Sequence, residues 1–368
     1  MSSVLAIDVG GTKAAVRAVT GGTATSGAAA ERIVAERTVR WEDGTAAGDL
    51  RRLREAAAGL GAGRPDAVAV AFPGTLDAAG VVTRWPTRPS WRGIDLPGLL
   101  REWFGVRPLI GDDAAFAAYA ETHARDVPTL FYLGLGTGVG GAYARRGDPP
   151  ERVTPCEAGH VVVRPDAPER CDCGRHGCLQ AYASGPRVLA EARWRRGRPV
   201  TPSELAAGLR AGHRWAHAAL DPAVAALGLT VADLAELLAP AVVAIGGGLG
   251  AGVPALTDRV RAEAARRLRA GTPAPDVRPA RFGARASLEG AVLAATRTLP
   301  VPATNPATNP ATNPATDPAT GPAADPAATG PTSTTRPASI TEPAPTTERK
   351  QRHDGRQPAR PAPLAVPR

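Results

Sequence analysis

Val4-Leu5-Ala6-Ile7-Asp8-Val9-Gly10-Gly11-Thr12-Lys13 is the stretch from which the fold of this chain can be worked out. An apolar run ends at Asp8, two glycines follow, and a second apolar run covers residues 14–19. This pattern predicts a strand, a tight glycine turn and a second strand. Glycine permits a positive φ and lets backbone N–H groups close around a phosphate, so the turn is a candidate phosphate site.

The same arrangement of a strand followed by a glycine turn recurs twice, at residues 134–141 and at Gly246-Gly247-Gly248-Leu249. The middle copy contains Gly136-x-Gly138-x-x-Gly141, the spacing of a dinucleotide fingerprint. That fingerprint must open a helix, whereas residues 142–145 look like a returning strand. We therefore reject a dinucleotide site, and no Walker lysine motif is present.

Strands alternate with helices along the first 299 residues, which predicts an α/β protein. Beyond the first hairpin, strands are expected at residues 67–72, 129–135 and 241–245. Helices are expected at residues 49–60, 96–104, 114–125, 186–195, 203–220, 253–269 and 287–298. Of the 37 prolines, 16 fall in residues 300–368, and residues 302–329 are seven proline-led tetrads. This composition predicts a disordered, extended tail.

The chain carries 44 basic and 35 acidic residues, a net charge of +9. Its arginines are scattered and no aromatic-basic module is visible, so we expect no nucleic-acid partner. The N-terminus has no basic region before Asp8 and does not read as a signal peptide. Two uncharged stretches, residues 127–144 and 237–256, are broken by glycine and read as strands and turns. We expect a soluble, cytoplasmic protein without a membrane partner.

Three of the four cysteines, Cys171, Cys173 and Cys178, lie within eight residues. With the imidazole of His160 they make a Cys₃His set, which suits tetrahedral Zn²⁺ in a closed, structural site. Reduced thiols without a metal are the alternative. Cys156 stands outside the pattern and is expected to be a small buried filler.

Taken together and in this order, the three turns resemble those of actin-like sugar kinases. Asp8–Lys13 resembles their first phosphate motif, residues 135–141 the second, and residues 242–249 the adenosine motif. Cys156-Glu157-Ala158-Gly159-His160 and the cysteine cluster resemble the signature of the ROK family (repressors, open reading frames and kinases) over about residues 4–298. The resemblance implies a two-domain actin-like (ribonuclease H-like) ATPase fold with an interdomain cleft. Its parts would be an N-terminal domain (residues 1–122), a C-terminal domain (123–286), a helix packing back on the first domain (287–299) and the tail (300–368).

The resemblance also implies ATP-dependent phosphorylation of the primary hydroxyl of a hexose or hexose-like polyol. Asp113, in Asp112-Asp113-Ala114, matches the family's catalytic base, although an aspartate at this place could be only a helix cap. Asp8 would hold Mg²⁺ through water. The donor phosphates and adenosine would be contacted by residues of the three turns, namely Gly10, Gly11, Thr12, Lys13, Gly136, Thr137, Gly138, Gly246, Gly247 and Gly248.

The acceptor side matches the family less well. Pro73, Gly74, Glu157 and His160 match its sugar-side residues, but Thr87 and Asp112 replace asparagines and Gln180 replaces a glutamate. Each change alters hydrogen-bond polarity, so glucose itself is in doubt. A modified hexose or a C7-cyclitol is a candidate, and an ordinary hexose with adjusted contacts stays open. Like-charge repulsion between Asp112 and Asp113 should raise one pKa if both face the pocket.

Other functions are possible for this family. A ROK repressor needs a DNA-binding helix-turn-helix before its body, and the phosphate motif begins too early here to leave room for one. A catalytically silent sugar sensor is opposed by the intact Asp8, Asp113 and glycine turns. Polyphosphate is an alternative donor, although the adenosine-side glycines favour ATP. A homodimer is possible.

Overall fold

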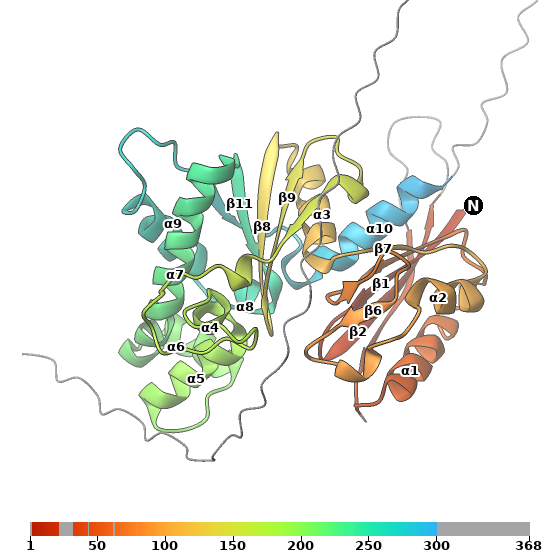
Figure 1. Cartoon of the computed structure of the whole chain (residues 1–368), viewed down its shortest axis with the longest axis horizontal. Coiled ribbons are helices and arrows are strands. Elements are labelled where there is room, and N and C mark those ends of the chain that lie inside the picture. Colours follow the sequence, from red (N-terminus) through yellow and green to blue (C-terminus); the bar gives the residue numbers. More distant parts are fainter. Residues whose placement is uncertain (1, 22–31, 43, 62, 300–368) are drawn as a thin grey trace, which may run out of the picture. The chain divides into compact units, whose positions relative to one another are not determined.

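The structure is a computed structural model that describes residues 2–21, 32–42, 44–61 and 63–299. The tail predicted from residue 300 onward lies outside the described residues. Two five-stranded sheets carry the fold, which confirms the α/β prediction (Figure 1). The first sheet has the order β3-β2-β1-β4-β7 and the second β10-β9-β8-β11-β12.

The two sheets repeat one topology. In the first, β1 (Ser2–Val9) pairs antiparallel with β2 (Lys13–Gly21) and parallel with β4 (Ala67–Ala71). In the second, β8 (Thr129–Leu135) pairs antiparallel with β9 (Val139–Arg145) and parallel with β11 (Val242–Gly246). The outer strands are β3 (Arg32–Arg40), β7 (Leu109–Gly111), β10 (Thr154–Cys156) and β12 (Asp276–Pro279). The sheets lie on either side of the predicted boundary at residue 122, and the domain limits themselves stay a prediction.

Helices α3 (Asp113–Arg125) and α10 (Ala286–Thr298) pack against each other and link the sheets. Contacts join α10 to β1 and β4, and α3 to β8 and β9 (Figure 1). Both helices are rich in alanine on their buried faces, so they share one apolar core with residues of both sheets. The ion pairs of buried Arg17 with Glu36 and Glu289 fasten α10 to β2 and β3.

The remaining helices cover the outer faces. Against the first sheet lie α1 (Ala46–Ala58) and α2 (Leu96–Phe104), which begin at the capping side chains of Thr45 and Asp95. The second sheet carries α4 (Gln180–Ala183), α5 (Gly185–Arg196), α6 (Pro202–Arg210), α7 (Arg214–Leu238), α8 (Gly247–Gly252) and α9 (Leu256–Ala265). Short elements are β5 (Thr75–Leu76), β6 (Val82–Arg84), η1 (Pro89–Trp91), η2 (Pro150–Arg152), η3 (Ala158–His160) and η4 (Gly283–Arg285).

Two predicted helices were wrong in extent. The helix expected at 203–220 is divided between α6 and α7, with a break at residues 211–213 where Gly212 adopts φ +70°. Helix α7 then continues through Pro222 to Leu238. Burial of its apolar residues on both sides of the proline stabilises the helix by more than the loss of one backbone hydrogen bond costs. The helix expected at 253–269 is confined to α9, since Pro254 precedes it. Strands β3, β5, β6, β7, β10 and β12 were not predicted.

Helix α7 is long and apolar enough to span a membrane, by length and composition alone. About two-thirds of its apolar window is buried inside the protein, in contact with α4, α5, α6 and α9. Packing in the core of the second half therefore accounts for its hydropathy.

Candidate active site and metal centre

The first glycine turn lies at the end of β1. Asp8 is the penultimate residue of that strand and faces Ala15 of β2 across the hairpin. The turn is closed by a hydrogen bond of 2.8 Å from the Gly10 N–H to the Lys13 carbonyl. Asp8 is half-buried, and burial raises its pKa to about 6 although Lys13 acts in the opposite direction.

Asp112 and Asp113 lie where β7 leads into α3. Because β1, β4 and β7 run parallel, Asp8, the Pro73-Gly74 turn and this aspartate pair follow the same edge of the sheet. Asp112 is the N-cap of α3, and its Oδ1 accepts a hydrogen bond of 3.0 Å from the Ala115 N–H. Asp113 Oδ1 accepts from the Ala114 N–H at 2.8 Å. Asp112 therefore caps α3 and also lies at the candidate site.

Neighbouring carboxylates add to the raised pKa values of Asp112 and Asp113. Burial is the largest cause of the rise in the pKa of Asp112 to about 7, and Asp113 and Glu157 add to it. Burial, then Asp8 and Glu157, raise the pKa of Asp113 to about 6. The predicted repulsion between like charges therefore contributes to the raised pKa of Asp112, although burial contributes more. A cluster of this kind favours a cationic ligand.

The second glycine turn joins β8 to β9. Gly136 N–H donates to the Gly138 carbonyl at 2.9 Å, and the Gly136 carbonyl accepts from Gly185 N–H at 2.8 Å. Gln180, predicted at the acceptor, lies against this turn, where its Oε1 accepts from the Val139 N–H at 3.0 Å. Thr137 is exposed at the tip of the turn.

The third glycine turn begins α8 and contacts the end of β8. Gly247 has φ +77°, and a Cβ there would overlap the Leu135 carbonyl, so only glycine fits. The hydroxyl of Tyr132 lies against this turn, where a Cβ on Gly246 would overlap it. Burial raises the pKa of Tyr132 strongly, and Asp113 and Asp8 add to the rise, so this tyrosine links the third turn to the carboxylates. Sequence reasoning missed Tyr132, because it appears there as one apolar residue of a strand.

On the acceptor side, Thr87 is exposed and lies next to the first turn. A Cβ on Gly11 would be 2.9 Å from Thr87 Oγ1. Behind it, Phe72, Trp85 and Trp91 form an aromatic cluster with ring centroids 4.9–6.0 Å apart. Pro73 and Gly74 directly follow this cluster's Phe72, so buried aromatic packing supports the predicted acceptor turn.

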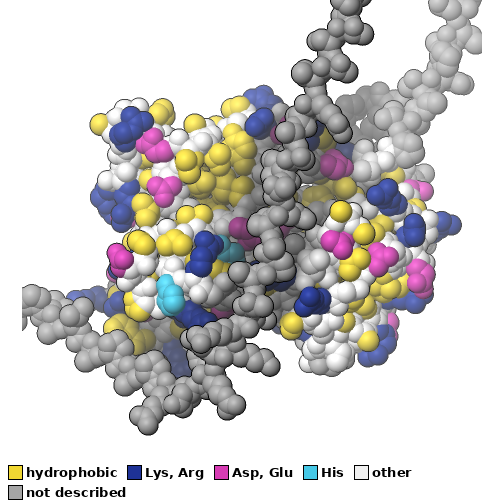
Figure 2. All heavy atoms as spheres, in the orientation of Figure 1, with side chains coloured by type: hydrophobic (Ala, Val, Ile, Leu, Met, Phe, Trp, Pro, Cys, Tyr) yellow, Lys and Arg dark blue, Asp and Glu magenta, His cyan; other side chains and the backbone are white. Residues whose placement is uncertain are grey.

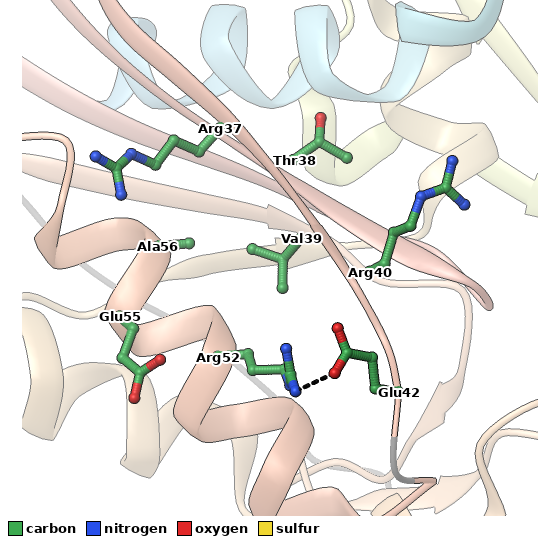
Figure 3. A pocket seen from close by; sticks show the side chains of 8 residues that line it. All are labelled: Arg37, Thr38, Val39, Arg40, Glu42, Arg52, Glu55 and Ala56. Atoms are coloured by element: carbon green, nitrogen blue, oxygen red, sulfur yellow. Dashed lines mark hydrogen bonds and ion pairs between the residues drawn. The ribbon is translucent and has the colours of Figure 1, made fainter.

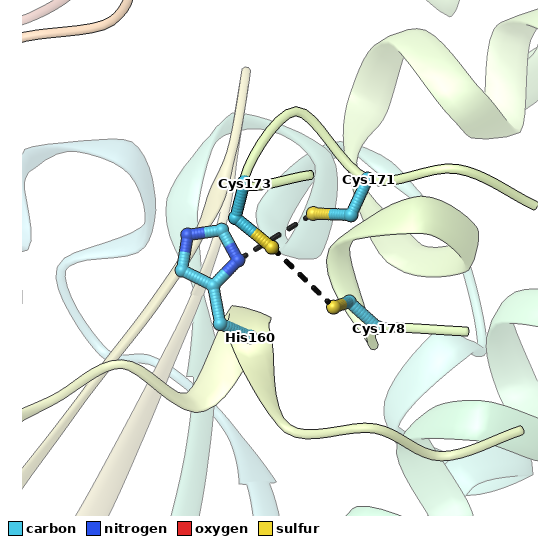
Figure 4. Close-up of side chains that lie close together, drawn as sticks. All are labelled: His160, Cys171, Cys173 and Cys178. Carbon is cyan, nitrogen blue, oxygen red and sulfur yellow. Dashed lines mark hydrogen bonds between the residues drawn. The ribbon is translucent and has the colours of Figure 1, made fainter. Parts of the chain in front are cut away.

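His160, Cys171, Cys173 and Cys178 converge as predicted (Figure 4), and their ligand atoms lie within 4.8 Å of one another. The loop closes because Gly177 has φ +70° and leaves no room for a Cβ beside the Arg164 carbonyl. Tetrahedral zinc with Zn–S of about 2.3 Å and Zn–N of about 2.0 Å requires S···S of about 3.8 Å and S···N of about 3.6 Å. Cys173 and Cys178 have an Sγ···Sγ distance of 3.7 Å, and Cys171 Sγ is 3.5 Å from His160 Nδ1, so the residues fit zinc.

His160 also connects this cluster to the acceptor side. Its Nδ1 faces Cys171, while its Nε2 is 3.9 Å from Glu157 Oε2. A metal-bound imidazole whose other nitrogen faces a carboxylate is a common arrangement that fixes the ring. Glu157 is exposed, yet close enough to raise the pKa values of Asp112 and Asp113.

One further surface carries none of the predicted site residues. A pocket between β3 and α1 is lined by arginines and glutamates, with an ion pair between Arg52 and Glu42 (Figure 3). On the face shown in Figure 2, basic side chains are interspersed with acidic ones over the described residues. The charges of the pocket are likewise mixed, so we assign no ligand to it.

The repeated sheet topology and the three glycine turns define a protein with the actin-like ATPase fold. The ROK family model matches residues 4–298, and the chain belongs to the ROK family. It is 40% identical over 309 residues to the kanosamine kinase of Amycolatopsis mediterranei, covering 79% of this chain and 95% of that protein. It is 31% identical over 202 residues to a glucokinase of Thermotoga maritima, covering 50% of this chain and 63% of that protein.

Solved structures agree. The ROK hexokinase of Thermus thermophilus superposes with a TM-score of 0.64 at 31% identity, covering 80% of this chain and 98% of that one. The ROK glucokinase of Streptomyces griseus, in complex with glucose and AMPPNP, gives a TM-score of 0.67 at 27% identity. The match covers 80% of this chain and 100% of that one. The predicted family and fold are thereby confirmed.

Proposed function

We propose that this chain transfers the γ-phosphoryl group of ATP to the primary hydroxyl of a hexose-like acceptor that carries an amino group. The chain is an ATP-dependent sugar kinase of the ROK family, as its relatives named for kanosamine and glucose and the AMPPNP-bound neighbour indicate. The amino group is the new element. The clustering of Asp112 with Asp113, Asp8 and Glu157 supports it most directly.

Asp113 would act as the general base. Its carboxylate takes the proton of the acceptor's primary hydroxyl, the hydroxyl oxygen bonds to the γ-phosphorus, and the bond to the bridging oxygen breaks to release ADP. The N–H groups of the first two turns would hold the donor phosphates, and residues 246–248 the adenosine side. Asp8 would hold Mg²⁺ through water, which supplies positive charge to the phosphates.

The four ligands His160, Cys171, Cys173 and Cys178 would bind a structural zinc. The ion would act through His160, whose ring would hold Glu157 at the acceptor. Pro73, Gly74 and Thr87 would border the acceptor from the other side. Gln180, placed against the second turn, would act on the acceptor only through that turn.

An amino sugar suits the charge of this pocket better than glucose does. Kanosamine is glucose with an amino group in place of one ring hydroxyl, and its ammonium would neutralise Asp112. A hydrogen bond between charged groups contributes about 1.5–3 kcal/mol, or about 10- to 150-fold in affinity. The alternative acceptors, a C7-cyclitol without an amine and plain glucose, offer only neutral hydroxyls to the same carboxylate.

An acceptor panel tests the proposal. Full-length protein would be assayed with ATP and Mg²⁺ on kanosamine, glucose and a C7-cyclitol, with the product's phosphorylated position read by ³¹P NMR. We expect kanosamine to be favoured at least about tenfold in kcat/KM, and Asp112→Asn to lower its kcat/KM about 10- to 100-fold while sparing glucose. Preference for the cyclitol or glucose, or an equal loss on all acceptors, would contradict the assignment. No turnover at all would favour the silent sensor.

Metal analysis of the purified protein tests the zinc assignment, with one Zn²⁺ expected per chain. A homodimer, a cytoplasmic location and the absence of nucleic-acid partners stay predictions from the sequence.

A further inference from the structure

Three successive carbonyls of the first glycine turn are held from outside the turn. The Gly10 carbonyl accepts from the indole Nε1 of Trp41 at 2.7 Å. The Gly11 carbonyl accepts from Arg88 Nε at a longer 3.4 Å, and the Thr12 carbonyl from the Trp41 backbone N–H at 3.2 Å. Two residues distant in sequence thus fix consecutive peptide planes.

Fixing these carbonyls also fixes the direction of the N–H group on the other side of each peptide bond. In a planar trans peptide the C=O of one residue and the N–H of the next point in opposite directions. The N–H groups of Gly11, Thr12 and Lys13 therefore point away from Trp41 and Arg88. These are the donors that the turn can offer to a phosphate.

Arg88 is itself held by a buried network. Its Nη1 pairs with Asp49 Oδ2 at 3.2 Å; the Asp49 side chain is 0% exposed and that of Arg88 13%. Trp91 Nε1 donates to the same Asp49 oxygen at 2.9 Å, and the guanidinium lies 5.7 Å from the ring centroid of Trp41. A buried ion pair contributes little net stability, because desolvation offsets the attraction, so stability alone does not account for this pair.

The same arginine follows Thr87, which contacts the first turn. Displacement of the Arg88 side chain would therefore disturb both the donor-side N–H groups and the predicted acceptor residue. The network spans residues 41, 49, 88 and 91, none of which is among the predicted site residues.

We propose that Arg88, held by Asp49, is a positioning residue that aims the N–H groups of the first phosphate turn at ATP. The inference rests on the proposed function, because it assumes that this turn binds phosphate. Lysine at position 88 could pair with Asp49 but lacks the guanidinium fork that reaches Asp49 and Gly11 together. Misplacement of such donors typically costs about 10- to 100-fold in rate.

The test compares Arg88→Lys with Arg125→Lys in the full-length protein. Arg125 and Glu121 form a matched control pair, since their side chains are also 13% and 0% exposed. The control lies at the far end of α3, about 18 Å from Asp113 at 1.5 Å per residue. Mg²⁺–AMPPNP affinity by calorimetry, KM for ATP with glucose as acceptor, and thermal unfolding would be measured for both.

We expect both variants to lose similar thermal stability, and only Arg88→Lys to weaken AMPPNP binding and kcat/KM for ATP, by about tenfold or more. If Arg88→Lys does not fold, the near-isosteric Asp49→Asn carries the same expectation. If Arg88→Lys folds, combining it with Asp49→Asn should add little, because both act through one contact. Equal nucleotide affinity in Arg88→Lys and Arg125→Lys would overturn the inference. Failure of the unaltered protein to bind AMPPNP would instead refute the proposed function.

Discussion

Replacing Asp112 with asparagine tests the coupling of charges at the start of α3. Burial, then Asp8 and Glu157, raise the pKa of Asp113 from 3.8 to about 6. A general base must be ionised, so kcat/KM should rise with pH through about 6. Asp113 adds to the raised pKa of Asp112, and a repulsion between two neighbouring carboxylates acts on the titration of both. Asp112→Asn removes this repulsion, so we expect the acidic limb of the profile to move to lower pH. Asparagine is an equally good N-cap, so the helix start is retained.

The size of the effect is bounded by the structure. Burial is the largest cause of the raised pKa and stays in the variant, so the limb cannot fall as far as 3.8. Two unit charges about 4 Å apart interact by about 1 kcal/mol at the dielectric constant of water, which we take as the scale of the repulsion. At about 1.4 kcal/mol per pH unit, the expected shift is about 0.5–1 unit downward.

The assay is the initial rate of ATP consumption at limiting acceptor between pH 5 and 8. Asp95→Asn is the matched control, because Asp95 caps α2 in the same way, accepting from the Gly98 N–H at 2.9 Å. Its profile should coincide with that of the unaltered protein. An acidic limb that stays in place or moves upward in Asp112→Asn would refute the electrostatic reasoning.

Three further predictions follow from the site. Asp113→Asn should lower kcat by about 10²- to 10⁴-fold with little change in AMPPNP affinity, and near-normal turnover would contradict its role as base. Cys178→Ser should lower the zinc content below one per chain and raise KM for the acceptor through His160, with KM for ATP as the internal control. Gly247→Ala should cost at least about 1–2 kcal/mol of stability, measured by denaturant unfolding, since its φ is +77° and its Cβ would overlap the Leu135 carbonyl.

The turns and the start of α3 could be read from the sequence because backbone chemistry fixes them locally. Glycines after a buried strand permit only a few conformations, and an aspartate before an alanine-rich helix is a cap. The Cys₃His cluster was equally accessible, since its ligands lie within 19 residues of one another. The resemblance to ROK kinases then supplied the roles that local patterns alone left open.

The network around Asp49 could not be predicted in this way. Arg88 and Trp91 follow Asp49 by 39 and 42 residues, and Arg88 is 77 residues from Gly11. Nothing in the sequence around Asp49 distinguishes a buried carboxylate from one on a helix surface. Gln180 shows the converse difficulty. Its position after the last cysteine predicts the acceptor side, whereas its contact with the second turn, where its Oε1 accepts from the Val139 N–H, could not be read from the sequence. Long-range packing, which periodicity does not encode, decides both cases.

The charge of the site connects catalysis with the choice of acceptor. Raised carboxyl pKa values mean that these groups favour folding below pH 3.8, and that this stability is lost as the pH passes about 6 to 7. At neutral pH the empty site therefore holds carboxylates that repel one another, and a cation relieves the repulsion. On the proposed function, Mg²⁺ would do so at Asp8 and an ammonium at Asp112. A hydroxyl of glucose would donate a hydrogen bond to Asp112 but leave its charge uncompensated, so selectivity would arise partly as a penalty against the neutral sugar.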